Sequence, residues 1–186
     1  MRVIAGEFRS RLLQAPKGMS TRPTSDRLRE TLFSVLGPRV EGSRFVDLYA
    51  GSGAVGIEAI SRGAEFVWFA EKAPAAVAAV RANLAALKIS AGYALEDRSV
   101  ARLLESMLKR GQAAEIVYLD PPYEAEEDYR ATLEWLGRHH AAVLGDAALV
   151  IAEHARRDSL EARYGMLERT RVLEQGDAAL SFYQVS

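Results

Sequence analysis

The sequence predicts an α/β fold: a mostly parallel sheet of seven strands, helices on both faces, and an antiparallel C-terminal hairpin. The first observation is that short apolar runs rich in aromatic and β-branched residues alternate with helical patterns from residue 45 onward. This alternation is typical of parallel strands joined by crossover helices. The second is that the last two apolar runs, 166–173 and 178–185, are separated only by a short turn around Gly176, as in a hairpin.

The N-terminal part has a different pattern. Residues 2–14 predict two short strands forming a hairpin around Gly6, and a helix is expected to begin near Asp26 after an N-cap at Thr24 or Ser25. The remaining strands are expected at 45–49, 66–70, 92–96, 115–119 and 147–152. Helices are expected around 57–60, at 74–88 and 99–110, and through 129–136. We therefore divide the chain into an N-terminal extension, residues 1–43, and a main domain, residues 44–186.

Composition excludes several classes of protein. The 186 residues contain no cysteine, so disulfides, thiolate metal sites and cysteine nucleophiles are absent. The N-terminus lacks a signal-peptide pattern and no apolar run is long enough to span a bilayer, which favours a cytoplasmic protein. The net charge of −1 hides an asymmetry, because residues 1–44 hold nine basic and four acidic side chains. A cationic front on an acidic body indicates a polyanionic partner, although a solvated charged face is an alternative.

A glycine-rich turn follows the first strand of the main domain. Gly51, Gly53 and Gly56 fit the G-x-G-x-x-G pattern between a strand and a helix, and Glu71 lies 20 residues beyond Gly51. This spacing is typical of a site for an adenosine-bearing cofactor, with the acid accepting hydrogen bonds from ribose hydroxyls. Asp47 places a carboxylate beside the turn, where it would attract a cationic amino group and repel a pyrophosphate. That favours S-adenosylmethionine over a dinucleotide.

A second motif, Asp120-Pro121-Pro122-Tyr123, ends the strand at 115–119. Consecutive prolines form a rigid extended corner, and ligands of open α/β sheets bind at the carboxyl ends of strands. The corner offers a carboxylate, backbone carbonyls without a competing N–H on either proline, and an aromatic face. This set suits a flat group that bears an amine. The alternative is a simple turn in which Asp120 caps the next helix and Tyr123 packs in the core.

These motifs resemble those of class I S-adenosylmethionine-dependent methyltransferases that act on exocyclic amines. The segment Arg22-Pro23-Thr24 with Asp26-Arg27, Arg29-Glu30 and Thr31-Leu32-Phe33 is similar to the N-terminal signature of the RsmD family, the small-subunit (16S) rRNA guanine-N2 methyltransferases. The resemblance covers essentially the whole chain. It implies a Rossmann-like catalytic domain, and a cofactor site that includes Asp47, Ala50, Gly51, Ser52, Gly53, Glu71, Lys72 and Asp97. Asp97 would accept from the adenine amino group, or else cap a helix.

The resemblance also implies a mechanism. Asp120 and a backbone carbonyl, that of Pro121, would accept hydrogen bonds from the guanine 2-amino group and aim its lone pair at the methyl donor. Tyr123 would stack on the flipped-out base, and Pro122 would stiffen the corner. No metal is required. The N-terminal extension would bind the rRNA, within an assembling small subunit, through Arg2, Arg9, Arg11, Arg22, Arg27 and Arg29.

Three other functions remain open at this point. The Asp-Pro-Pro-Tyr motif also occurs in adenine-N6 methyltransferases acting on DNA or RNA. A nicotinamide-dependent oxidoreductase would share the glycine turn and Glu71, but would leave Asp47 and the Pro-Pro corner without a role. A non-catalytic RNA-binding assembly factor would use only the basic front. Arg27 and Arg29 have a structural alternative as well, because either could pair with Asp26 or Glu30.

Overall fold

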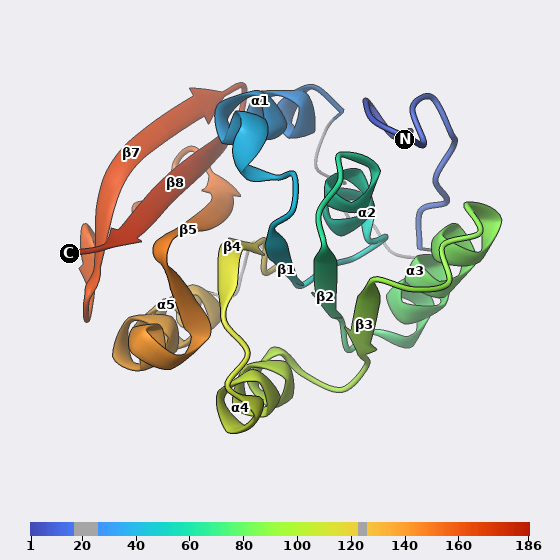
Figure 1. The fold of residues 1–186 in the computed structure, drawn as a ribbon. Coiled ribbons are helices and arrows are strands. Elements are labelled where there is room, and N and C mark those ends of the chain that lie inside the picture. Colours follow the sequence, from blue (N-terminus) through green and yellow to red (C-terminus); the bar gives the residue numbers. More distant parts are fainter. Residues whose placement is uncertain (17–25, 123–125) are drawn as a thin grey trace.

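The computed structural model of the protein describes residues 1–16, 26–122 and 126–186 (Figure 1). Its strands are β1 (Arg44–Leu48), β2 (Phe66–Ala70), β3 (Tyr93–Glu96), β4 (Ala114–Leu119), β5 (Leu144–Ala155), β6 (Arg163–Tyr164), β7 (Leu167–Gln175) and β8 (Ala178–Val185). Its helices are α1 (Asp26–Leu36), the short 3-10 helix η1 (Gly37–Arg39), α2 (Ala54–Ser61), α3 (Pro74–Ala86), α4 (Val100–Arg110) and α5 (Glu126–Val143).

All of these strands belong to one sheet with the order β3-β2-β1-β4-β5-β8-β7-β6. Strands β1 to β5 are parallel, and β8, β7 and β6 continue the sheet in antiparallel pairs. The predicted fold class is therefore confirmed, with eight strands instead of seven. The additional strand, β6, is two residues long and has no pattern of its own in the sequence. Strand β5 extends three residues beyond the predicted 147–152 because Glu153–Ala155 pair with β8.

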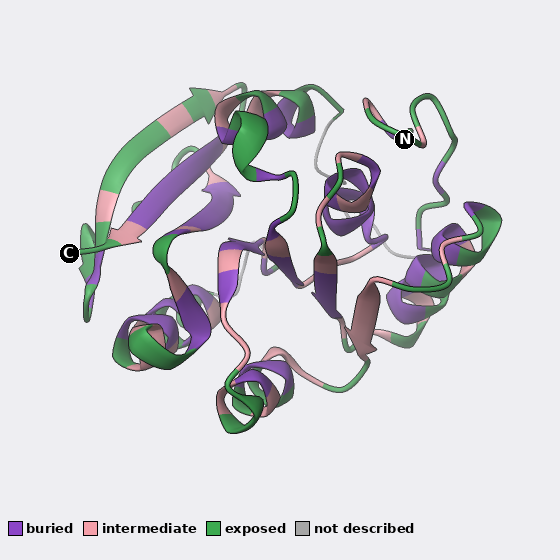
Figure 2. Cartoon of the chain, viewed as in Figure 1, coloured by how far each residue is buried: buried purple, intermediate pink, exposed green. Residues whose placement is uncertain are grey.

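The two faces of the sheet carry different helices. Along β1, Phe45 packs on the face covered by α1, α2 and α3, whereas Val46 and Leu48 pack on the face covered by α4 and α5. This alternation follows from the two-residue period of a strand. Figure 2 shows buried central strands and a largely exposed β7 at the outer part of the sheet. Among the described helices, none has the length and apolarity that a membrane crossing requires.

The N-terminal segment forms a minimal hairpin instead of two full strands. Its two arms pair through one isolated bridge, Arg2 to Leu12, and Val3 donates to the Arg11 carbonyl at 2.9 Å while Leu13 donates to the Met1 carbonyl at 3.0 Å. Between the arms the backbone bonds to helix α2: Ile4 and Ala5 donate to the buried carboxylate of Glu58 at 2.7 and 3.0 Å, and Glu7 donates to the carbonyl of Ser61 at 2.8 Å. The predicted hairpin is therefore confirmed, but its pairing is short because residues 4–7 find their partners on α2, more than fifty residues away.

The sheet order reverses between β1 and β4. The chain runs outward from β1 through β2 to β3, and then returns to place β4 and β5 on the other side of β1. Ligands of open α/β sheets bind at such a switch point, outside the carboxyl ends of the strands. Strand β1 ends at Leu48 and β4 at Leu119, so the glycine turn and the Pro-Pro corner begin side by side.

Candidate active site

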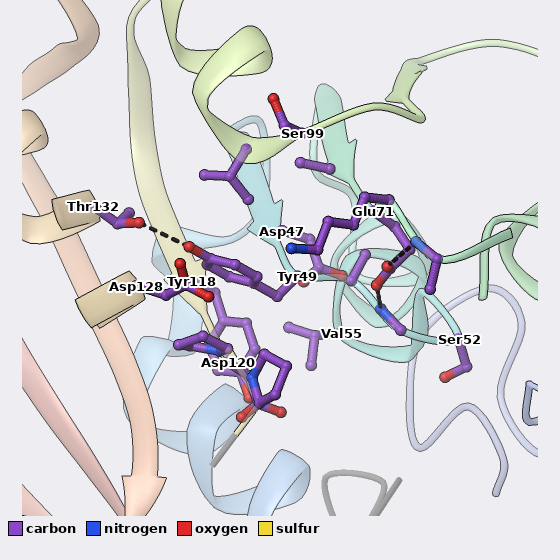
Figure 3. Close-up of a pocket in the computed structure, with 18 of the residues that line it drawn as sticks. Asp47, Tyr49, Ser52, Val55, Glu71, Ser99, Tyr118, Asp120, Asp128 and Thr132 are labelled. Carbon is purple, nitrogen blue, oxygen red and sulfur yellow. Dashed lines mark hydrogen bonds between the residues drawn. The ribbon is translucent and has the colours of Figure 1, made fainter. Parts of the chain in front are cut away.

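A cavity of about 590 Å³ opens at this switch point. It is lined by the segments that follow β1, β2 and β4, by the N-terminal parts of α2, α4 and α5, and by Met1, Ala15 and Pro16 of the N-terminal segment. Figure 3 shows Glu71 and Ser52 at one end of the cavity, Asp47 near its middle, and Tyr49, Thr132, Asp128 and Asp120 toward the other end. The two motifs that the sequence indicates therefore share one pocket.

The three glycines of the turn have different structural roles. Gly51 lines the cavity with φ at +57°, and no atom lies within 4 Å of the position its Cβ would take. Gly53 has φ at +77° and faces Val80 of α3, 3.3 Å from an added Cβ, so it shapes the turn without lining the cavity. An added Cβ at Gly56 would lie 2.2 Å from the Phe69 ring, so this glycine allows α2 to pack closely on β2.

Asp47 is fully buried at the end of β1. Its Oδ2 accepts a hydrogen bond from the Gly56 N–H at 2.8 Å, which fixes the carboxylate between the strand and α2. The pKa of Asp47 is raised to about 7, chiefly by burial; the hydrogen bond from Gly56 lowers it and the nearby Glu71 carboxylate raises it. Since Asp47 also lines the cavity, a bound cation would find a carboxylate that ionises near neutral pH.

Glu71 holds the glycine turn to the start of α3. Its Oε2 accepts from the Gly51 N–H at 2.9 Å and its Oε1 accepts from the Ala73 N–H at 2.8 Å. An ionised carboxylate has about four acceptor positions, so both oxygens can still accept from hydroxyl groups in the cavity. Proline at the first helical position of α3, as the sequence predicts, leaves Glu71 just before the helix.

The Pro-Pro corner extends β4 into the opposite end of the cavity. Asp120 is half-buried, its N–H donates to the Leu48 carbonyl at 3.4 Å, and Asp120, Pro121 and Pro122 all line the cavity. Two residues earlier in the chain, Tyr118 also lines it and donates from its hydroxyl to the buried carboxylate of Glu153. Tyr123 lies outside the described residues.

Several lining residues are not indicated by any sequence motif. Tyr49 has φ at +62°, a conformation that costs a non-glycine residue about 1–3 kcal/mol, and its hydroxyl lies 2.9 Å from Thr132 Oγ1 on α5. Asp128 and Trp135 of α5 line the same part of the cavity. Their helical spacing puts the α5 residues on one side of that helix, but the sequence does not show that this side faces the cavity.

The structure brings most, not all, of the predicted cofactor residues together. Ala50, Ser52 and Lys72 line the cavity with Asp47, Gly51 and Glu71. Asp97 does not line it: this exposed carboxylate pairs with Arg81 of α3 at 2.8 Å. Neither is Asp97 the helix cap, because Ser99 occupies that position and accepts from the Arg102 N–H at 3.2 Å. Ser99 itself lines the cavity. Serine is a typical N-cap residue, so the sequence indicates its place at the start of α4 but not its place in the cavity.

The predicted RNA-binding arginines divide into exposed and buried side chains. Arg2, Arg9, Arg11 and Arg27 are exposed. Arg29 is fully buried, and its guanidinium donates to the Arg2 carbonyl and to Asp26, the latter at 2.8 Å. The prediction of an RNA contact at Arg29 is therefore wrong, and its pairing with Asp26 is confirmed. Helix α1 buries Leu28 and Arg29 together, which a pattern of apolar residues alone does not indicate. Arg22 lies outside the described residues.

Comparison with known proteins places this geometry in context. Residues 1–184 match the model of a family described as conserved hypothetical protein 95. The chain is 35% identical over 184 residues to YlbH of Bacillus subtilis (strain 168), provisionally described as an rRNA methyltransferase; the match covers 99% of this chain and 98% of YlbH. It is 37% identical over 123 residues to ribosomal RNA small subunit methyltransferase D of Escherichia coli (strain K12), covering 66% of this chain and 60% of that protein.

A solved structure agrees with these sequence relatives. The Escherichia coli protein yhhF, provisionally described as a methyltransferase, superposes on this chain with a TM-score of 0.82 at 31% sequence identity. The match covers 100% of this chain and 98% of that one. The fold of this chain therefore belongs to an architecture that a related chain shares.

Proposed function

Because this chain belongs to the RsmD family, described as conserved hypothetical protein 95, we propose that it transfers a methyl group from S-adenosylmethionine to a guanine 2-amino group in small-subunit rRNA. One observation carries the proposal. The Asp120 corner and the glycine turn, which are 69 positions apart in the sequence at Asp120 and Gly51, line the same cavity. An acceptor for an amine and a site for an adenosine-bearing cofactor are thereby adjacent.

The residues at one end of the cavity fit S-adenosylmethionine. Glu71 would accept from the ribose hydroxyls while it holds the turn, and the open space beside Gly51 would admit the cofactor against the backbone. Asp47 would attract the cationic amino-acid end, and its carboxylate is unfavourable for a pyrophosphate. Ala50, Ser52 and Lys72 complete the proposed set, in which Ser99 replaces Asp97. When bound, the cofactor supplies an electrophilic methyl group on its sulfonium.

We expect the affinity for S-adenosylmethionine to depend on pH through Asp47. Below pH 7 this carboxyl carries a proton, because its pKa is raised to about 7. A neighbouring cation favours the ionised form, so binding releases a proton, and affinity rises by up to about tenfold per pH unit until it levels off above the pKa. Calorimetry in two buffers of different ionisation enthalpy measures the released proton. Asp47→Asn should abolish the dependence, and a wild-type affinity that does not change with pH would remove Asp47 from this role.

At the other end of the cavity, the chain's own groups position the target amine. The guanine 2-amino nitrogen is a poor nucleophile because its lone pair is delocalised into the ring. Asp120 and the Pro121 carbonyl would accept its two N–H bonds, orient the lone pair, and stabilise the positive charge that develops as the new bond forms. Tyr123 would stack on the extruded base. The apolar lining around Tyr49 and Trp135 would exclude water from the reacting atoms.

The N-terminal extension, residues 1–43, is proposed to contact rRNA in an assembling small subunit, and residues 44–186 to form the catalytic domain. Replacing both Arg9 and Arg11 by alanine should weaken RNA binding and reduce its salt slope by about one to two units, because each exposed cation releases roughly one counterion. Binding titrations at several salt concentrations measure the slope. Replacing Lys109 and Arg110 at the exposed end of α4 is the matched control. Equal slopes in the wild type and the Arg9/Arg11 variant would contradict the phosphate contacts.

The proposed function is tested by mapping the methylated nucleotide. Small-subunit particles from a strain that lacks this protein are incubated with the enzyme and labelled S-adenosylmethionine, and the labelled base is then identified. We expect a single guanine labelled at N2. Labelled adenine would support the adenine-N6 alternative. The absence of label, together with the absence of cofactor binding, would favour a non-catalytic RNA-binding protein.

A further inference from the structure

Helix α5 turns one side of its surface to the cavity. Asp128, Ala131, Thr132 and Trp135 line the cavity at the spacing i, i+3, i+4 and i+7, which places them along one side of a helix. The neighbouring acid of the first turn, Glu127, is exposed and pairs with Arg130 at 3.0 Å. Asp128 is therefore the acid of this turn that lines the cavity.

Tyr49 fixes the part of the cavity that Asp128 faces. Its backbone is left-handed, and its hydroxyl is bonded to the buried Thr132, one helical turn after Asp128. The side chain is thus held at both ends, by the backbone that follows β1 and by Thr132 of α5. Desolvation raises the pKa of Tyr49, the bond to Thr132 lowers it, and the Asp128 carboxylate raises it, so the phenol stays neutral. Asp128 and Tyr49 line the same cavity, on the side of Thr132.

Figure 3 shows Asp128, Tyr49, Thr132 and Asp120 at the same end of the cavity. Within the part of the chain that the structure describes, Asp128 makes no ion pair, unlike Glu127. The end of the cavity proposed to receive the target base thus has two carboxylates, Asp120 and Asp128. Orienting the 2-amino group gives a role to Asp120 but not to Asp128. If Asp128 also accepts a hydrogen bond from the base, the base must offer a second donor.

The edge of the base that carries the 2-amino group supplies this donor. In guanine, the atom next to that group is N1, which bears a hydrogen. In adenine the N1 atom is an acceptor, and a carboxylate facing it would be repelled. Desolvated hydrogen-bonding groups discriminate strongly against a base that leaves them without a partner.

We propose that Asp128 is a specificity-determining residue that accepts a hydrogen bond from N1–H of the target guanine, against a wall formed by Tyr49 and Thr132. This inference rests on the proposed function and extends it from the methylated atom to the recognition of the base. Asp120 holds the amine that receives the methyl group, and Asp128 selects the base that carries it.

The experiment compares guanine with 2-aminopurine at the mapped target position of reconstituted small-subunit particles. The analogue keeps the 2-amino group but has a lone pair in place of N1–H. The full-length wild-type enzyme should strongly prefer guanine. Asp128→Ala should lose on the order of a hundredfold in kcat/KM on guanine and little on 2-aminopurine, so the preference falls by at least about tenfold. Asp128→Asn keeps the side-chain size and supplies an N–H that can donate to the analogue, so its preference should fall too. Glu127→Ala, which removes the adjacent exposed carboxylate, should keep the wild-type preference.

The outcomes separate the two proposals. A lower preference in Asp128→Ala, with wild-type affinity for S-adenosylmethionine by calorimetry, supports the inference. An unchanged preference in Asp128→Ala, with guanine still methylated by the wild type, overturns the role of Asp128 and leaves the proposed function intact. A wild-type enzyme that methylates no guanine overturns the proposed function, and the inference with it.

Discussion

Asp120→Ala is expected to lower the rate of methyl transfer by at least about 100- to 1,000-fold while S-adenosylmethionine binds almost as tightly as to the wild type. Asp120 lies on the Tyr49 side of the cavity, whereas Glu71 and Ser52 mark the other end. The change therefore removes an acceptor for the target amine and leaves the cofactor end unaltered. The loss should appear in kcat more than in KM, because the interaction strengthens as positive charge develops on the nitrogen.

Asp120→Asn is the informative companion to this variant. An asparagine keeps one acceptor oxygen at nearly the same position but lacks the negative charge. Activity between those of the wild type and the alanine variant would indicate that both geometry and charge contribute. Single-turnover rates and calorimetric affinities, measured on the same preparations, separate chemistry from binding. Wild-type turnover in Asp120→Ala would exclude Asp120 from the mechanism, and a parallel loss of cofactor affinity would assign it to the cofactor site.

The parts of the site that the sequence predicts correctly depend on local signals. A strand, a glycine turn and a helix lie within residues 44–61, and the second motif directly follows β4. Each can be recognised without knowing what packs against it. That both open into one cavity follows from the parallel order of β1 and β4, since parallel strands end at the same edge of a sheet.

The errors arise where a residue's partner is distant in the sequence. The pairing of the N-terminal hairpin is limited to one bridge because the backbone between its arms bonds to Glu58, and Arg29 is buried because of how α1 packs. Asp97 ends a strand as expected, yet its carboxylate is paired with Arg81. Asp128 and Tyr49 are missed for the same reason, because only the packing of α5 against the sheet brings its residues to the segment that follows β1. The pattern of charged and apolar residues indicates which positions are buried on average. It does not indicate which polar groups form hydrogen bonds or ion pairs with each other.

Glu58→Ala is expected to reduce the free energy of unfolding by about 3–5 kcal/mol. The carboxylate is completely buried and accepts from the N–H groups of Ile4 and Ala5 and from Arg62 Nε at 2.7 Å. Its removal leaves two backbone donors and one guanidinium without their acceptor, and each unsatisfied buried group carries a desolvation cost. Urea denaturation measures the loss, and Glu65→Ala, an exposed acid beyond the same helix, should stay within about 0.5 kcal/mol of the wild type.

The same carboxylate connects fold stability to the cofactor site. Glu58 anchors the segment whose Met1, Ala15 and Pro16 line the cavity, and Asn83 of α3 holds its far end by accepting from the Gln14 N–H at 2.8 Å. Glu58→Gln, which preserves the side-chain shape and one acceptor oxygen, should keep the protein folded but loosen this segment. We then expect faster hydrogen exchange in residues 2–14 and weaker S-adenosylmethionine binding, with Asp47 and Glu71 unchanged. If exchange accelerates there while affinity stays at the wild-type value, the N-terminal segment covers the cavity without contributing to it.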